Sequence, residues 1–171
     1  MEYPYIIESY RLLLIPFYSN KDPREIIELL KKRLGTKFTV INGNKAYSPK
    51  LILIAYIMAR RSFKRGSNIS RNLGIEMLLY LSGTRQIRDA IKDVGYNGGR
   101  GLIVAWEIED PGDILNDVSS IVNVKDVTLE HIKPEDLLKE GYHKDVVKRY
   151  EKANLLELLA IEKVNLLEVE D

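Results

Sequence analysis

The amino-acid sequence predicts one α+β domain, in which a small mixed β-sheet is covered by several α-helices. Strand-like and helix-like segments follow one another in the order strand, helix, strand, several helices, strand and helix, which is typical of this fold class. The chain has 171 residues, of which 45% are hydrophobic, so it can bury one sizeable core. No repeat, low-complexity tract or Gly/Ser-rich linker interrupts it, so residues 1–171 are predicted to form a single domain.

Three segments make up the first part of the chain. Residues 5–17 are an apolar run that predicts a strand stopped by Pro16. Residues 22–35 begin with Asp-Pro, carry apolar residues at helical spacing and end in glycine, which together predict a helix. Residues 36–43 are rich in β-branched residues and end in Asn-Gly, which predicts a short strand and a turn.

Three helices are predicted in the middle of the chain. The first begins at a Ser-Pro pair and covers about residues 48–61. The second, residues 71–82, is apolar almost all round and is expected to be buried. The third covers residues 84–94, with Thr84 as its N-cap. The apolar side chains that share one face of the third helix, and are expected to pack against the core, are Ile87, Ala90, Ile91 and Val94.

The remaining segments complete the predicted domain. Residues 101–109 form a continuous apolar run, the pattern of a strand in the interior of a sheet. Residues 110–122 repeat the Asp-Pro helix start, and residues 124–129 predict a short strand. Residues 145–163 predict a long last helix, and residues 165–171 are either a final strand or an acidic tail.

Composition and charge exclude several classes of protein. Lys and Arg number 26 against 25 Asp and Glu, giving a formal net charge of +1, so any basic surface must be local. The absence of cysteine excludes disulfides, thiolate catalysis and zinc–thiolate sites. The N-terminus is acidic where a secretory signal is basic, and the longest apolar stretches are about half of the roughly 20 residues that cross a bilayer. We therefore expect a cytoplasmic protein with no membrane partner.

No catalytic motif is recognisable in the sequence. It has neither a P-loop nor a nucleophile elbow, and its carboxylates form no paired motif in an apolar setting. His131 and His143 stand in predicted loops without metal-ligand spacing, so each is interpreted as a surface histidine. The glycine-rich residues 95–101 run from helix to strand, opposite to a phosphate-binding loop, and predict a helix stop and a tight turn. We expect no enzyme activity, cofactor or metal.

A basic stripe is predicted on the outer face of the third helix, formed by Arg85, Arg88 and Lys92. The N-terminus of a helix repels arginine, but a bound phosphate would reverse this effect by meeting both the guanidinium and the free N–H groups. An internal role for Arg85 remains open. Glu76 is the one charge within residues 72–82 of the predicted buried helix, and a buried carboxylate needs a partner, which Arg85 could be.

A second basic segment, residues 59–71, contains no acidic residue. A charge run is usually a solvated surface, but this one flanks the buried helix that leads to Arg85. The two segments could therefore line one groove for nucleic acid. Phe63, Tyr80 or Tyr96 could offer a stacking face to an unpaired base, unless these rings pack in the core.

Residues 74–95, GIEMLLYLSGTRQIRDAIKDVG, resemble the hallmark stretch of a known family. This family is the CGI-type small subunit of the KEOPS (EKC) tRNA-modifying complex, which includes the human kinase-binding protein TPRKB. The motif is an apolar helix containing a Glu, followed by a glycine, Arg-Gln-Ile and Ala-Ile. Its positions here are Glu76, Gly83, Arg85, Gln86, Ile87, Ala90 and Ile91. Residues 145–164 resemble the C-terminal half of the family, and the layout agrees over nearly the whole chain.

The resemblance implies an α+β fold without catalytic activity of its own. Members of the family bind the small kinase/ATPase subunit of KEOPS and, through it, act with the threonylcarbamoyl transferase and dimerising subunits. In archaeal complexes they also hold tRNA, notably its single-stranded 3′ CCA end, while the adenosine beside the anticodon is threonylcarbamoylated. With the basic pattern, the resemblance gives the candidate tRNA contacts Arg60, Arg61, Lys64, Arg65, Arg71, Arg85, Gln86, Arg88 and Lys92.

The kinase-facing surface is expected on the last predicted helix. Its apolar side chains cover more of the helix than one core-facing stripe needs, unless residues 165–171 cover them. These side chains are Leu155, Leu156, Leu158, Leu159 and Ile161. Two other functions remain open, namely a small stand-alone nucleotide- or phosphate-binding enzyme that uses Arg85 and the glycine-rich turn, and a kinase adaptor without RNA contact.

Overall fold

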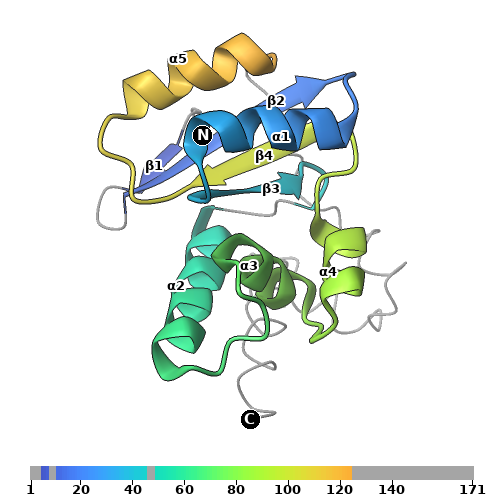
Figure 1. Ribbon diagram of the computed structural model, residues 1–171, viewed down its shortest axis with the longest axis vertical. Helices are drawn as coiled ribbons and strands as arrows, with labels where there is room; N and C mark the ends of the chain where they lie inside the picture. The colour runs from blue at the N-terminus through green and yellow to red at the C-terminus, as the bar shows by residue number, and fades with distance from the viewer. Residues whose placement is uncertain (1–4, 8–10, 46–48, 125–171) are drawn as a thin grey trace, which may run out of the picture.

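The computed structural model of the protein describes residues 5–7, 11–45 and 49–124. These residues form one β-sheet between two layers of helices, so the predicted α+β class is confirmed (Figure 1). In chain order the elements are β1 (Tyr5–Ile7), β2 (Leu12–Ser19), α1 (Pro23–Leu34), β3 (Phe38–Asn42), α2 (Pro49–Arg65), α3 (Leu73–Ser82), α4 (Ile87–Val94), β4 (Gly99–Ala105) and α5 (Pro111–Ile121).

The sheet has four strands in the order β1-β2-β4-β3, and each neighbouring pair is antiparallel. The prediction of a mixed sheet is therefore wrong for the described strands. The strands β2 and β3 do run in the same direction, as expected for a strand–helix–strand unit. However, β4 pairs with both of them and lies between them, so the two never form a parallel ladder.

Both faces of the sheet are buried, which explains its continuous apolar strands. Leu13 and Ile15 of β2 point into a core with α1 and α5, whereas Leu12 and Leu14 point into a second core with α2, α3 and α4. Residues of β4 alternate between the two cores in the same way. Because successive strand residues face opposite sides, a sheet covered on both sides needs apolar residues at nearly every position.

The predicted strand 5–17 is wrong in its bounds. The structure has a hairpin of β1 and β2 there, and Pro16 lies inside β2 opposite Leu102. The Tyr18 N–H donates to the Asn123 carbonyl at 3.1 Å, on the edge of β2 that faces away from β4. Alternate N–H groups of a strand point to the same edge, so the N–H that proline lacks would face away from β4 as well. Pro16 therefore removes no hydrogen bond from the β2–β4 ladder.

The edge strand β3 is covered by α3 where the helix begins. Asn72 caps α3 by accepting the Ile75 N–H at 3.0 Å, and the helix ends at Gly83, whose φ of 68° is favoured by glycine. Gly74 lies directly against β3. A Cβ at this position would be 2.8 Å from the Thr39 Cβ. Glycine thus allows the helix to approach the edge closely and to shield it.

The helix α4 begins three residues later than predicted. Gln86 is its N-cap and makes no side-chain capping bond, so Thr84 is not the cap. Instead the Thr84 hydroxyl accepts the Gln86 N–H at 3.2 Å in the turn before the helix. Ala90 and Val94 are buried as expected, but Ile91 is 45% exposed, so its assignment to the core is wrong. The helix meets the core along a stripe narrower than its apolar face.

Candidate nucleic-acid interface

The carboxylate of Glu76 holds together α3, the end of α2 and the loop between them. The residue is 2% exposed. One carboxylate oxygen accepts the Ser70 N–H at 2.8 Å and the Ile69 N–H at 3.1 Å, and the other accepts the Ser62 hydroxyl at 3.1 Å. Charge-assisted hydrogen bonds of this kind compensate the burial of a carboxylate. Glu76 is therefore a structural residue that fixes the shape of the α2–α3 loop.

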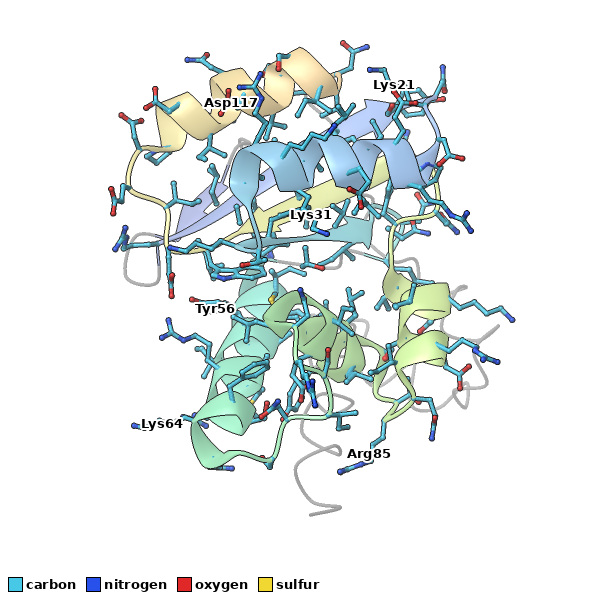
Figure 2. The ribbon with its side chains drawn as sticks, in the orientation of Figure 1. Lys21, Lys31, Tyr56, Lys64, Arg85 and Asp117 are labelled. Atoms are coloured by element: carbon cyan, nitrogen blue, oxygen red, sulfur yellow. The ribbon has the colours of Figure 1, made fainter. Side chains whose placement is uncertain are left out.

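Arg85 is not the partner that satisfies this carboxylate. It is an exposed residue in the connection between α3 and α4 (Figure 2). The neighbouring N–H groups are also engaged, because Gly83 donates to the Leu79 carbonyl at 3.0 Å and Gln86 donates to the Thr84 hydroxyl at 3.2 Å. The prediction that a phosphate meets free N–H groups beside Arg85 is therefore wrong for Gly83 and Gln86.

The C-terminal half of α2 presents aromatic and basic side chains on one face. They recur at the helical spacing i, i+4, i+7 and i+8, which places them above one another. With residues of α3 and of the segment after β4, they enclose an open hollow of about 600 Å³, here called the basic hollow. It is lined by Tyr56, Ile57, Arg60, Arg61, Phe63, Lys64, Leu73 and Glu107.

The guanidinium of Arg60 is held in place by Tyr56. Its Nη1 donates to the Tyr56 hydroxyl at 3.0 Å, and its Cζ lies 5.6 Å from the centre of the Tyr56 ring. The hydrogen bond to Tyr56 raises the pKa of Arg60. Tyr56 is itself fixed against Trp106, with the ring centres 6.1 Å apart. An arginine ordered in this way loses little side-chain freedom when it binds an anion.

Phe63 is the aromatic residue that can stack on a ligand in the basic hollow. Of the three candidates from the sequence, Phe63 is 36% exposed, whereas Tyr80 and Tyr96 are each 7% exposed. Tyr80 belongs to the core under α2, α3 and α4, and Tyr96 packs on Phe17 with ring centres 5.1 Å apart. The stacking prediction is therefore wrong for both tyrosines.

Glu107 is a carboxylate in this otherwise basic site. Its Oε2 lies 3.0 Å from the Lys37 Nζ. The hydrogen bond from Lys37 lowers the pKa of Glu107, while partial burial opposes this effect and the charges of Arg60 and Arg11 support it. The backbone of Glu107 has a φ of 57°, in the left-handed region. Arg11 stabilises this turn by donating to the Glu107 carbonyl at 3.2 Å and the Ile108 carbonyl at 2.9 Å.

The structure does not bring the two predicted basic segments into one groove. The helix α3 contacts both α2 and α4 and lies between them (Figure 1). Lys64 on α2 and Arg85 beside α4 accordingly lie on different sides of this layer (Figure 2). Arg60, Arg61 and Lys64 line the basic hollow. The other candidates are exposed but outside its lining, namely Arg65, Arg71, Arg85, Gln86, Arg88 and Lys92.

A second hollow, of about 290 Å³, lies between α1, β3, α3 and α4. We call it the apolar hollow, and its apolar walls include Ile27, Phe38, Ile75, Leu78 and Ile91. Ile27 and Ile91 are exposed at the surface. The sequence does not predict this hollow, because helical spacing alone assigns Ile91 to the core.

Some expected features lie outside the described residues. These are the predicted strand 124–129 after its first residue, the predicted last helix 145–163, residues 165–171, the histidines His131 and His143, and the kinase-facing side chains from Leu155 to Ile161. Within the part that the structure describes, no group of three or more His, Asp and Glu side chains could hold a metal ion, and no helix is long and apolar enough to cross a membrane. The predicted helix stop at Gly95 is confirmed, because the Gly95 N–H donates to the Ile91 carbonyl at 3.1 Å. Gly98 and the first residue of β4, Gly99, both have positive φ, but no regular turn is assigned between α4 and β4.

The sequence of the chain matches a known protein family and a named relative. Residues 17–168 match the family model described as "Kinase binding protein CGI-121". The chain belongs to the CGI-121 family. It is also 30% identical over 148 residues to the KEOPS complex subunit Cgi121 of Pyrococcus abyssi (strain GE5 / Orsay), covering 83% of this chain and 85% of the relative. The resemblance stated from the sequence is therefore confirmed.

The structure explains several residues of the CGI-121 motif as parts of the fold. Glu76 fixes the α2–α3 loop, Gly83 ends α3 with a positive φ, and Ala90 packs in the core. Sequence reasoning missed Glu107 and Tyr56 as residues of the basic hollow. The signal for Tyr56 was its helical spacing to Arg60, and for Glu107 it was a charge directly after a buried strand.

Proposed function

We propose that this CGI-121 chain is a non-catalytic subunit of a KEOPS complex that binds the kinase/ATPase subunit and helps to hold tRNA. The catalytic transfer to the adenosine beside the anticodon belongs to another subunit in this proposal. The family match and the relative named as a KEOPS subunit support membership of the complex. The observation that carries the tRNA contact is the basic hollow, where Phe63 lies among Arg60, Arg61 and Lys64.

The chemistry of the basic hollow suits an unpaired RNA end. Arg61 and Lys64 are exposed and can meet phosphates, while the exposed ring of Phe63 offers a base a stacking surface. A base in a duplex cannot reach such a ring, whereas a base in a single-stranded end can. The 3′ CCA end of tRNA is the proposed ligand. Arg88 and Lys92 on α4 are proposed to contact phosphates elsewhere on the same tRNA.

The test is tRNA binding by a double charge reversal, Arg61→Glu with Lys64→Glu, measured by fluorescence anisotropy at several salt concentrations. The affinity should fall about tenfold or more, and the slope of log affinity against log salt should decrease by about 0.7–0.9 for each phosphate that the variant no longer binds. Removal of the CCA end should weaken wild-type binding and abolish the difference between wild type and variant.

A matched control reverses two charges elsewhere. Arg24 and Lys32 are exposed on α1, which covers the opposite face of the sheet (Figure 1). The variant Arg24→Glu with Lys32→Glu changes the net charge equally and should retain tRNA affinity. If both variants lose the same affinity, binding reflects overall charge, and the assignment of the hollow is wrong.

The kinase contact has two candidate surfaces. One is the apolar face of the predicted last helix, and the other is the apolar hollow at Ile91. We expect Leu156→Glu or Leu159→Glu to abolish binding of the kinase subunit, measured by isothermal titration calorimetry, while circular dichroism of the free chain stays unchanged. Loss of the folded spectrum would place these leucines in the core. If only Ile91→Glu abolishes binding, the contact belongs to the apolar hollow.

A further inference from the structure

We infer that Glu107 makes the basic hollow selective for unpaired bases that carry an exocyclic amino group, and that uracil is rejected. This inference rests on the proposed tRNA-holding function and adds a specificity to it. The cations of the hollow attract any phosphate and cannot distinguish one base from another. Base selection needs a group that reads the base edge, and Glu107 is the acidic residue in the lining.

The position of Glu107 is fixed by contacts from two other segments, which contain Lys37 and Arg11. The Lys37 ammonium holds one carboxylate oxygen at 3.0 Å. The guanidinium of Arg11 donates to the carbonyls of Glu107 and Ile108. These contacts hold Glu107 at a φ of 57°. This left-handed conformation is common for glycine, less so for Asn and Asp, and unfavourable for most other residues. The turn therefore places a carboxylate, in a defined orientation, at the edge of a site for a polyanion.

The protonation state of Glu107 determines what it can recognise. Its pKa is lowered, chiefly by the hydrogen bond from Lys37, so at neutral pH the carboxylate is ionised and only accepts hydrogen bonds. The side chain is 44% exposed, so a ligand can reach it. An amino group on the base edge can donate to this carboxylate. Uracil has no amino group, and its N3–H lies between two carbonyl oxygens that the carboxylate repels.

Phe63 and Glu107 therefore have complementary roles. The Phe63 ring accepts the face of any base, because every base can stack. Glu107 then favours cytosine and adenine, whose amino groups it can accept, over uracil. Both bases of the CCA end carry such a group, whereas a uridine-rich end has none. The carboxylate also repels a phosphate placed at its own position, which orients the strand with its phosphates toward Arg61 and Lys64.

The test removes only the amino groups from the RNA. Short oligoribonucleotides ending in CCA are compared with the same RNAs in which the end carries 2-pyrimidinone for cytosine and purine for adenine. The wild-type chain should bind the amino-free RNA roughly five- to tenfold more weakly, as expected for loss of hydrogen bonds to an exposed charged group. The variant Glu107→Met should bind both RNAs equally.

The matched control is Glu109→Met. Glu109 carries the same charge two residues away and lies 3.7 Å from the Arg11 Nη2, but it is outside the lining of the hollow. Its loss should raise affinity for all RNAs and preserve the discrimination. Equal discrimination by the wild type and Glu107→Met would overturn the inference, as would equal binding of both RNAs by the wild type, although the tRNA-holding proposal would then stand. If the wild type binds neither RNA, that proposal fails and the inference fails with it.

Discussion

The two charged residues of the CGI-121 motif, Glu76 and Arg85, differ in what surrounds them. Glu76 is buried and receives hydrogen bonds from Ser62, Ile69 and Ser70. Arg85 is exposed in the connection after α3. Removal of a buried acceptor leaves its donors unsatisfied, whereas a group that contacts an exposed guanidinium can bond to water once the guanidinium is removed.

The two alanine variants should therefore differ in stability. We expect Glu76→Ala to lower the free energy of unfolding by about 3 kcal/mol, because the N–H groups of Ile69 and Ser70 lose their acceptor, while the Ser62 hydroxyl keeps the Ala59 carbonyl at 2.8 Å. Arg85→Ala should change it by about 1 kcal/mol or less, because water can replace a polar interaction at an exposed site. Urea denaturation followed by circular dichroism measures both values. A loss for Arg85→Ala as large as for Glu76→Ala would restore the ion-pair interpretation of the motif.

Tyr96 gives a second prediction at this scale. Its hydroxyl is buried and has no hydrogen-bond partner among the described residues. Burial, with a smaller effect of Tyr18, raises the pKa of Tyr96 above 10.0. The folded state therefore resists ionisation, so stability is complete below about pH 10 and is lost as the pH rises further.

The variant Tyr96→Phe should keep the ring contact with Phe17 and remove the unpaired hydroxyl. We expect it to raise the free energy of unfolding at pH 7 by about 1 kcal/mol and to reduce the loss of stability above pH 10. Thermal denaturation between pH 7 and pH 11 tests both effects. A clear destabilisation at pH 7 would mean that the hydroxyl has a partner.

The limits of sequence reasoning are clear for these residues. The sequence predicts that Glu76 is buried, because it stands within an apolar helix, but two of the donors that it binds, Ile69 and Ser70, lie in an irregular loop. The orientation of Glu107 depends on a positive φ that Arg11 stabilises across the sheet, and no local pattern encodes such a contact. Exposure of Arg60, Arg61 and Lys64 followed directly from their charge.

At the scale of elements, the contact between α3 and the edge strand β3 depends on one missing side chain. In Gly74→Ala, the new Cβ would lie 2.8 Å from the Thr39 Cβ and 3.0 Å from the Phe38 carbonyl oxygen. Neither neighbour is the end of a flexible side chain, so the helix must move. We expect a loss of about 1–3 kcal/mol in chemical denaturation, typical of overpacking.

Gly35→Ala serves as the comparison for Gly74→Ala. A Cβ at Gly35 meets nothing within 4 Å, but the φ of 63° strains any side chain. Its loss should therefore reflect backbone strain alone, about 1 kcal/mol. A smaller loss for Gly74→Ala than for Gly35→Ala would show that α3 can shift away from β3 easily.

The success of the element predictions depends on how local their signals are. The helix α1 is predicted within a residue at each end, because Asp22 accepts the Arg24 N–H and Gly35 takes a positive φ, and both properties are encoded locally. The hairpin in residues 5–17 is missed. Its turn uses Arg11 at a φ of 51°, where the sequence offers no glycine or asparagine to mark it.

At the scale of the whole molecule, the basic hollow and the apolar hollow share no lining residue. Binding sites without shared contacts usually behave additively. We therefore expect Arg61→Glu with Lys64→Glu to reduce tRNA affinity by the same factor in the free chain and in the kinase-bound chain. Parallel anisotropy titrations measure both factors. A factor that changes once the kinase is bound would indicate that the two partners meet on the same surface.

The sheet order is beyond what the sequence can predict. The apolar run of β4 indicates an interior strand, and this is correct because β4 lies between β2 and β3. Which strands flank it depends on how α1 crosses the sheet and where α2, α3 and α4 pack, and these are long-range contacts. Local periodicity contains no information about them.

The central place of β4 affects how the chain emerges from the ribosome. Its two neighbours, β2 and β3, are complete by residue 42, but β4 begins only at residue 99. At a synthesis rate of about 5–20 residues per second, the two apolar strands wait several seconds for the strand that joins them. During that interval the nascent chain exposes surfaces that aggregate readily, so its yield in the cell should depend on chaperones that bind near the exit tunnel.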